Sequence, residues 1–138
     1  MVVRKLNLPQ IYIEAFTDTK QSDWFYGYVN AGAQYNLLPP TFTGSIQGNK
    51  PITREEMAYI VMKAYDYKLT NKKVQPSALF YNDASEVSFW ARDNISRATE
   101  LKIIQGWNNN FKPKDNATRA ESATMLYNLF RAEGIFSE

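Results

Sequence analysis

The 138-residue sequence contains no cysteine and no histidine. Without cysteine the chain can form neither a disulfide nor a thiolate zinc site, and without histidine it lacks the commonest general base and transition-metal ligand. No segment has the alternating oxygen ligands of a calcium loop. No apolar run approaches the roughly 18 residues that a membrane-spanning helix requires. We therefore predict no bound metal, no cofactor and no membrane insertion.

The sequence also lacks a strong excess of charge of either sign. Sixteen Lys and Arg residues oppose fourteen Asp and Glu residues, for a net charge of +2. Nucleic-acid binding usually needs a concentrated basic stripe, so we expect no nucleic-acid partner. A glycosidase needs two suitably spaced carboxylates, and no acidic pair stands out beyond positions that helix capping or solvation explains. We predict no catalytic residues and no enzymatic activity.

The N-terminus lacks the features of a signal peptide. Residues 1–9 contain a basic pair, Arg4 and Lys5, but neither an apolar stretch nor a small-residue cleavage site follows it. The chain therefore either stays inside the cell or is a fragment of a longer exported protein.

A short signature occurs twice in the chain. Thr-Arg-Glu-Glu at 53–56 and Thr-Arg-Ala-Glu at 118–121 lie 65 residues apart. The acidic landmarks Asp18 and Asp83, each shortly after a phenylalanine, have the same spacing. A tryptophan follows each of them, Trp24 in the first copy and Trp90 in the second. Three landmarks in one order at nearly one offset indicate a tandem repeat.

The repeat defines the organisation of the chain. We predict an N-terminal arm at 1–14, a first repeat at 15–67, a polar linker at 68–78, and a second repeat with its tail at 79–138. Apolar residues at helical spacing predict helix, loop, helix within each copy. The predicted fold class is mainly α, with tandem helix-loop-helix repeats.

The opening helix of the second repeat is expected to begin at Asp83, with Glu86 three residues later completing the cap. Residues at helical spacing follow: Trp90, Ala91, Asn94, Ile95, Ala98 and Leu101. In the first copy Gly27 and Gly32 weaken the corresponding pattern. In the loops, Phe111 and its counterpart Ile46 are expected to be apolar plugs.

The second helix of each copy starts at the signature. Thr53 and Thr118 are predicted N-caps, and the glutamates at 56 and 121 complete capping boxes. The apolar face of the first of these helices is predicted to comprise Met57, Ile60, Val61 and Ala64. That of the second is predicted to comprise Met125, Leu126, Leu129 and Phe130.

Capping explains the threonine and the glutamate of the signature but leaves the arginine unexplained. Arg54 and Arg119 would occupy the first helical position, where the helix dipole disfavours a cation by roughly 0.3–1 kcal/mol. One compensating partner is an internal carboxylate such as Asp18 or Asp83. The other is an external anion, held by the arginine fork together with free backbone N–H groups.

Aromatic residues are abundant, with nine Tyr, eight Phe and three Trp. They can pack between short elements, or some can be exposed as flat platforms for sugars or bases. Trp24 and Trp90 therefore have two interpretations. Each is either a core residue or a stacking partner for a sugar held near the signature arginines.

The residues of both copies resemble the S-layer homology repeat. That pattern has Phe-x-Asp, then Trp-Ala, a glycine-containing turn, Phe-x-Pro and finally Thr-Arg-x-Glu. The second copy matches most fully, at Phe80, Asp83, Trp90, Ala91, Gly106, Phe111, Pro113 and 118–121. The first copy keeps 16–18, Trp24 and 51–56, but has Pro39 and Pro40 at the glycine turn and Ile46 in place of the aromatic residue.

The resemblance implies a non-catalytic module that anchors a protein to the bacterial cell surface. Such repeats usually occur in threes and form a pseudo-threefold helical bundle that binds cell-wall polysaccharide in grooves between repeats. The implied ligand is an anionic, possibly pyruvylated polymer or peptidoglycan. The implied ligand-binding residues are Arg54, Arg119, Asp18, Asp83, Trp24, Trp90 and Gly106.

Two alternatives stay open. Because only two repeats are visible, a third repeat could lie outside the fragment, or a homo-oligomer could complete the bundle. The same fold could also serve as a protein–protein assembly module that has lost its glycan site, with Arg54 and Arg119 held in internal ion pairs.

Overall fold

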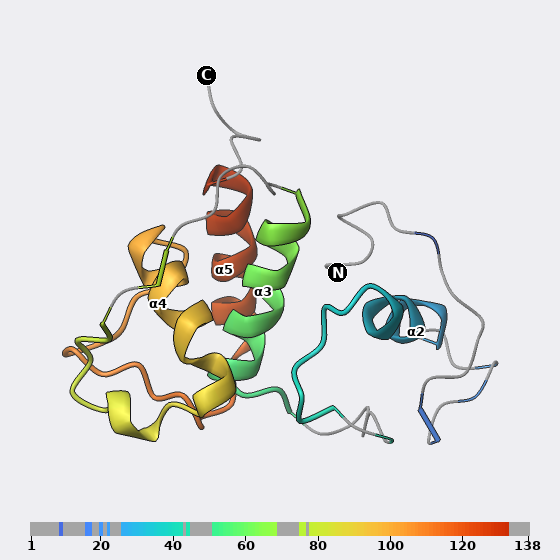
Figure 1. Cartoon of the computed structure of the whole chain (residues 1–138), viewed down its shortest axis with the longest axis horizontal. Coiled ribbons are helices and arrows are strands. Elements are labelled where there is room, and N and C mark those ends of the chain that lie inside the picture. Colours follow the sequence, from blue (N-terminus) through green and yellow to red (C-terminus); the bar gives the residue numbers. More distant parts are fainter. Residues whose placement is uncertain are drawn as a thin grey trace. The chain divides into compact units, whose positions relative to one another are not determined.

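The computed structural model describes residues 9, 16–17, 20, 22, 26–42, 44, 51–68, 75–76 and 78–132. The chain divides into two compact units, Met1–Lys50 and Pro51–Glu138. The first contains α2 (Tyr26–Gln34). The second contains α3 (Arg54–Lys68), the 3₁₀ turns η1 (Ala84–Glu86) and η2 (Phe89–Ala91), α4 (Arg92–Glu100) and α5 (Arg119–Ala132) (Figure 1). The described residues form isolated bridges but no β-strand, which confirms the mainly α fold class.

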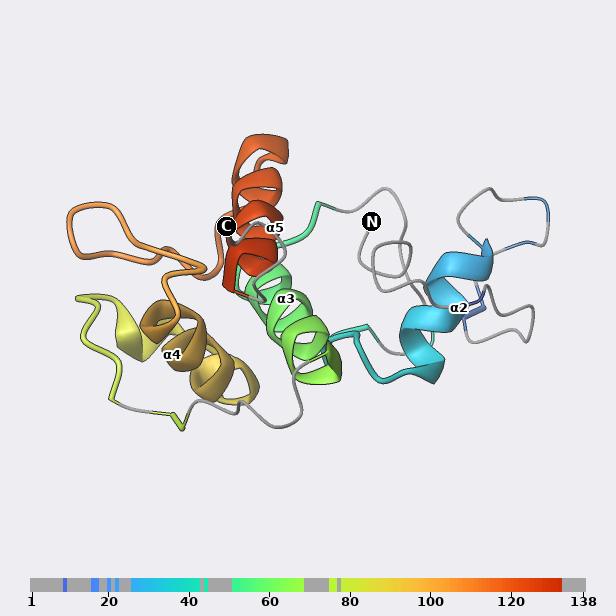
Figure 2. The same ribbon diagram turned by 90° about the horizontal axis from the view of Figure 1, so that it is seen from above.

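The second unit is built around α3, a helix that belongs to the first sequence repeat. α3 packs against both α4 and α5 (Figures 1 and 2). Its buried apolar side chains are Met57, Ala58, Val61, Met62, Ala64 and Tyr65. This set is wider than the predicted face, and Ile60 is only half-buried. The extra burial follows from packing on two neighbours, because a helix with a single partner buries one stripe.

The helices of the second repeat supply the rest of this core. Met125, Leu126 and Leu129 of α5 are buried as predicted, while the side chain of Phe130 lies outside the described part. The loop residue Phe111 is fully buried, which confirms it as a plug; Ile46 lies outside the described residues. None of the helices in the described part of the chain has the length and apolar character needed to cross a membrane.

The opening helix of the second repeat starts later than the sequence predicts. Two 3₁₀ turns precede α4, which begins only at Arg92. Asp83 makes no side-chain capping bond. Its carboxylate instead accepts the N–H groups of Phe111 at 2.9 Å and Lys112 at 2.7 Å. The predicted Asp83–Glu86 cap is therefore wrong, because the carboxylate is used to hold the distant loop after α4.

Both opening helices end in the same left-handed turn. Asn36 and Lys102 have φ values of 57° and 60°. The next N–H group in each copy closes a Schellman turn: Leu37 bonds to the Gly32 carbonyl at 2.9 Å and Ile103 to the Ala98 carbonyl at 2.9 Å. The first copy thus keeps the turn although Pro39 and Pro40 follow it.

A second feature common to both copies ties the start of each repeat to its own loop. The Thr17 N–H group bonds to the Gly44 carbonyl at 2.7 Å, and the Asn82 N–H group bonds to the Asn109 carbonyl at 2.7 Å. Gly44 and Asn109 both have positive φ, 68° and 60°. The repeat seen in the sequence is therefore also a repeat of backbone hydrogen bonds.

These bonds correct the pairing of the aromatic landmarks. If Thr17 corresponds to Asn82, then Phe16 corresponds to Tyr81 and not to Phe80. Phe16 is buried, whereas Phe80 is 81% exposed. The Tyr81 ring instead packs on Phe111, with ring centroids 5.6 Å apart. Phe80, the residue before Tyr81, takes no part in this packing and lies on the surface.

Candidate functional site

The two signatures form capping boxes, as predicted. In the first, the Thr53 N–H group bonds to Glu56 Oε1 at 3.0 Å, and the Glu56 N–H group bonds to Thr53 Oγ1 at 3.2 Å. The reciprocal bonds between Thr118 and Glu121 are 2.9 and 3.0 Å. Each arginine therefore occupies the first helical position, Arg54 in α3 and Arg119 in α5.

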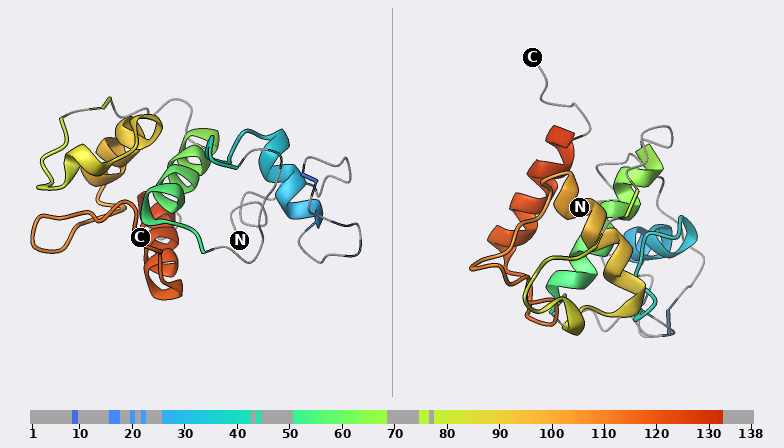
Figure 3. Two further views of the ribbon diagram at one scale, coloured as in Figure 1. Left: turned by 90° about the horizontal axis from the view of Figure 1, so that it is seen from below. Right: turned by 60° about the vertical axis from the view of Figure 1, so that its left-hand side comes forward.

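The N-terminus of α3 is covered by the loop that leads to α5. The Arg54 N–H group bonds to the Asp115 carbonyl at 2.8 Å, and the Glu55 N–H group bonds to the Pro113 carbonyl at 3.1 Å. Figure 3 shows this loop running out from α4 and returning to the start of α5. An anion site with free N–H groups is therefore wrong at α3, since its first-turn donors are already bonded.

The Arg54 side chain is bonded within the chain as well. Its Nε donates to the Phe111 carbonyl at 2.8 Å, its Nη1 forms an ion pair with Glu121 of the second signature, and its Cζ lies 5.0 Å from the centroid of the Phe111 ring. The side chain is 13% exposed. Burial lowers the pKa of Arg54, and the nearby Asp115 carboxylate opposes this shift. The compensating partner that Arg54 requires is thus Glu121.

This partner differs from the two carboxylates that the sequence suggested. Asp83 bonds to the loop backbone and does not contact Arg54 through a hydrogen bond or ion pair. Asp18 lies outside the described residues. The pair joins the arginine of one signature to the glutamate of the other, so it links the two repeats.

Arg119 is in a different environment. It is exposed, and among the residues that the structure describes its side chain has no hydrogen-bond or ion-pair partner. Within the described ranges, the N–H groups of Arg119 and Ala120 also have no carbonyl partner like those that cover the equivalent groups of α3. The two arginines, equivalent in sequence, are therefore not equivalent in the structure.

Two cavities share Arg54, Gln105 and Glu121, and we call them together the Arg54 groove. The larger has a volume of about 450 Å³ and the smaller about 250 Å³. Further residues of the larger cavity include Gly106, Trp107, Asn110, Lys112, Asn116 and Thr118. The groove thus combines one exposed aromatic side chain with many hydrogen-bonding groups.

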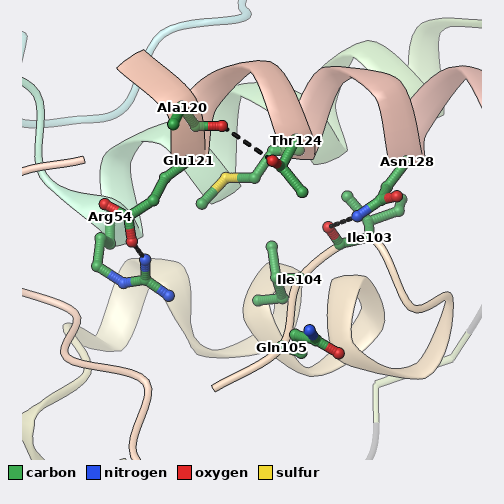
Figure 4. Close-up of a pocket in the computed structure, with 9 residues that line it drawn as sticks. Arg54, Ile103, Ile104, Gln105, Ala120, Glu121, Thr124 and Asn128 are labelled. Carbon is green, nitrogen blue, oxygen red and sulfur yellow. Dashed lines mark hydrogen bonds and ion pairs between the residues drawn. The ribbon is translucent and has the colours of Figure 1, made fainter. Parts of the chain in front are cut away.

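Figure 4 shows the smaller cavity of the groove. Glu121 extends from α5 to Arg54, and Ile104 and Gln105 lie on the opposite side, in the segment after α4. The Asn128 amide donates to the Ile103 carbonyl at 3.1 Å and fixes this segment to α5. The helix carrying Glu121 and the segment carrying Gln105 are therefore held together as the walls of one cavity.

Trp107 is the exposed aromatic residue of the groove and was missed in the sequence. It is 75% exposed and begins a tight turn in which Trp107 and Asn110 exchange backbone hydrogen bonds of 2.9 and 3.0 Å. Asn108 and Asn109, at the centre of the turn, have φ values of 50° and 60°. Such values define a type I′ turn, which asparagine tolerates. An aromatic residue just before Asn-Asn was the signal available in the sequence.

Gly106 lines the groove and packs tightly. A Cβ atom at this position would lie 2.4 Å from the Asn110 carbonyl oxygen and 2.8 Å from Tyr81 Cε1. Glycine is therefore required for the close approach of the two sides of the Trp107 turn. Close packing thus explains why glycine occupies position 106. That Gly106 also contacts a ligand directly stays a prediction.

Of the two tryptophans predicted as stacking platforms, the structure describes Trp90, which does not join this groove. Trp90 packs edge-on against Tyr59 of α3, with ring centroids 5.4 Å apart and planes at 78°, and it does not line the two cavities. Trp24 lies outside the described residues. Of the predicted site residues, the structure brings Arg54 and Gly106 together, and Asp83 holds the adjoining loop.

The Glu55 side chain of the first signature is held by hydrogen bonds within the chain. It is buried, and its carboxylate accepts the Ser88 N–H group at 3.0 Å, the Ser88 hydroxyl at 2.5 Å and the Lys114 ammonium at 2.9 Å. This network ties the first turn of α3 to two loops of the second repeat.

No group of three or more Asp or Glu side chains within the described ranges is arranged to hold a metal ion.

A family model of the S-layer homology domain matches residues 15–58 and 80–123. The chain belongs to the S-layer homology family. The two matched segments start 65 residues apart, which is the offset that pairs Phe16 with Tyr81. Family membership identifies the chain as a cell-surface anchoring module.

Relatives of this S-layer homology chain include large enzymes and a surface protein. It is 35% identical over 136 residues to an amylopullulanase of Thermoanaerobacterium thermosulfurigenes, covering 97% of this chain and 7% of that protein. It is 34% identical over 131 residues to the exoglucanase XynX of Acetivibrio thermocellus, covering 94% and 12%. It is 27% identical to the S-layer protein sap of Bacillus anthracis, covering 91% and 15%. The chain thus spans only a small part of each of these relatives.

Proposed function

We propose that this S-layer homology module attaches its parent protein to the bacterial cell wall by binding wall polysaccharide without cleaving it. The observation that carries the proposal is the Arg54 groove, an open cavity lined by polar groups beside the exposed Trp107. A sugar ring offers an apolar face for an aromatic side chain and hydroxyl groups for polar partners. The groove provides both kinds of contact.

The lining of the groove suits a polar ligand of low charge. Gln105, Asn110, Asn116 and Thr118 carry amide or hydroxyl groups that can donate to and accept from sugar hydroxyls. Two cations and two carboxylates also line the larger cavity: Arg54, Lys112, Asp115 and Glu121. Since these charges balance, the groove favours recognition by hydrogen bonding and stacking over recognition by net charge.

Arg119 supports binding of the charged substituents of an anionic wall polymer, such as the carboxylate of a pyruvyl group. Its guanidinium is exposed, and the N–H groups of Arg119 and Ala120 have no carbonyl partner among the described residues. A helix start of this kind favours anions. A polymer chain can thus engage the groove through its sugar rings and Arg119 through its acidic groups. Several weak contacts of this kind add up to strong attachment.

The alternative function is a protein–protein assembly module of the same fold. The observation that favours it is the Arg54–Glu121 ion pair, because an arginine already held within the chain is less available to a ligand. Under this alternative the exposed Trp107 and Arg119 would contact a protein, such as a further repeat or a second copy of the chain. Purified cell wall would then not retain the module.

Co-sedimentation of the purified chain with isolated Gram-positive cell wall tests the function, before and after the secondary polysaccharide is stripped. We expect pelleting that is lost on stripping and weakened in both Trp107→Ala and Arg119→Ala. The matched control is Arg131→Ala, at the other end of α5, whose contact to the Lys102 carbonyl is a long 3.5 Å. Equal pelleting of stripped and intact wall would refute polysaccharide anchoring.

A further inference from the structure

Another cavity lies at the end of α4, apart from the Arg54 groove. It has a volume of about 160 Å³ and is lined by residues 78–81, by Ser96, Thr99 and Glu100 of α4, and by Asn109. It shares no lining residue with the two cavities of the groove. We call it the Phe80 cavity, after the exposed ring among its lining residues.

We propose that the Phe80 cavity is a second sugar site, which binds an amino sugar whose amino group is a free ammonium. This inference rests on the proposed function and adds a ligand class to it. The amino sugar is a ring of the same wall polymer, bound at a place that the Arg54 groove does not reach.

The first argument concerns the two hydroxyl groups that line the cavity, those of Tyr81 and Thr99. The Thr99 hydroxyl donates to the Ile95 carbonyl at 2.8 Å. The Tyr81 hydroxyl is therefore the donor in the 3.0 Å bond between Tyr81 and Thr99. With its hydrogen used in this way, the Tyr81 oxygen can offer a ligand only an acceptor.

The Asn109 amide is used in the same way. Its Nδ2 donates one hydrogen to the Phe80 carbonyl at 3.0 Å and the other to Asn82 Oδ1 at 3.1 Å. What Asn109 still offers is Oδ1, a second acceptor. A ligand that matches these two side chains must supply hydrogen-bond donors, and an ammonium group has three donors and no acceptor.

The charge of the cavity also favours a cation. Glu100 is the one charged residue in its lining, and it is exposed. Among the described residues, the Glu100 carboxylate has no hydrogen-bond or ion-pair partner. Glu100 is also the last residue of α4, and the carbonyl end of a helix attracts cations. A ligand ammonium would therefore meet a negative charge and a favourable helix end together.

Phe80 favours a sugar over a simple amine. Its ring is 81% exposed, so a flat face is available beside the acceptors. An aromatic face stacks on the apolar face of a sugar ring and also attracts a cation. A lysine side chain could reach Glu100, but its narrow methylene chain would leave most of the Phe80 ring uncovered. An amino sugar uses the ring, the acceptors and the carboxylate at once.

The experiment titrates the full chain with methyl β-glucosaminide and with methyl β-glucoside, which has a hydroxyl in place of the amine. Slightly acidic buffer keeps the amine protonated, and NMR follows the Tyr81 ring and the Asn109 amide. We expect wild type to bind the glucosaminide about two- to fivefold more tightly, the gain of a solvent-exposed ion pair. Added salt should reduce this preference.

Two variants separate the contributions of charge and ring. In Glu100→Gln the two affinities should become equal, whereas in Phe80→Ala both should fall. The matched controls are Glu86→Gln and Phe89→Ala, because Glu86 is exposed, Phe89 is 93% exposed, and neither lines the cavity. Both controls should bind the two sugars as wild type does. Thermal melts establish that each variant is folded.

Equal affinities in wild type, no binding of either sugar, or a preference that survives in Glu100→Gln would overturn the inference. So would butylamine binding as tightly as the glucosaminide, since the site would then recognise an amine chain and not a sugar. The proposed function can fail separately. Wild type that does not sediment with cell wall but keeps the Glu100-dependent preference refutes anchoring alone, and sedimentation without that preference refutes the amino-sugar site alone.

Discussion

Replacing Gly106 by alanine is the most direct test of how the groove is built. The added Cβ would lie 2.4 Å from the Asn110 carbonyl oxygen and 2.8 Å from Tyr81 Cε1. Tyr81 is confined by its packing on Phe111 and by a 3.0 Å hydrogen bond between its hydroxyl and Thr99. The Asn110 oxygen belongs to the backbone of the Trp107 turn, so the turn itself must open to make room.

The expected cost follows from these contacts. Inserting a methyl group into a tightly packed site typically costs about 1–3 kcal/mol. At roughly 4 °C per kcal/mol, a value within the range for small domains, the melting temperature should fall by about 4–12 °C. Opening of the turn also moves Trp107, so wall binding should weaken in addition to stability.

The control is the same substitution at Gly32, inside α2. There the added Cβ would meet the Leu38 side chain at 3.4 Å, an ordinary contact. Alanine is a better helix former than glycine by about 0.5–1 kcal/mol, so Gly32→Ala should be neutral or stabilising. Thermal melts by circular dichroism at several protein concentrations measure both variants. A Gly106→Ala chain as stable as wild type would refute the close packing argued for this turn.

Three further predictions concern the framework around the groove. Glu55→Ala should destabilise the chain by about 1–3 kcal/mol in urea unfolding, because the partly buried Ser88 N–H group loses its acceptor. Ser88→Ala should cost less, and a larger loss in Ser88→Ala than in Glu55→Ala would contradict this network. Asp83→Asn should cost about 1–2 kcal/mol, because one of the two loop N–H groups loses its acceptor. Burial raises the pKa of Tyr59 above its ordinary value of 10.0. The unfolded chain then ionises first, so stability should fall as the pH rises above 10.0, and Tyr59→Phe should reduce this fall.

Local patterns in the sequence predicted the parts of the structure that depend on neighbours along the chain. The capping boxes at Thr53 and Thr118 and the plug at Phe111 were found because each depends on residue type at short spacing. The opening of the second repeat was not predicted correctly. Asp83 has the spacing of a helix cap, but its carboxylate bonds to loop N–H groups 28 and 29 residues away.

Long-range contacts explain the other differences. The partner of Arg54 is Glu121, which the sequence assigned wholly to the second capping box; one glutamate oxygen caps α5 while the other pairs with Arg54. The correspondence of Tyr81 to Phe16 was hidden because a phenylalanine, Phe80, directly precedes Tyr81 in the second copy. Burial alone distinguishes Phe80 from Tyr81, and burial depends on the tertiary fold.

The position of α3 has a consequence for how this chain can be cut and recombined. The segment that was duplicated in sequence ends after α3, but the compact unit that contains α3 begins at Pro51. A truncation in the predicted linker at 68–78 would therefore remove from the second repeat the helix on which α4 and α5 pack. Chimaeras that exchange whole repeats at that linker should expose an apolar face, whereas exchange ahead of Pro51 keeps α3 with the helices that cover it.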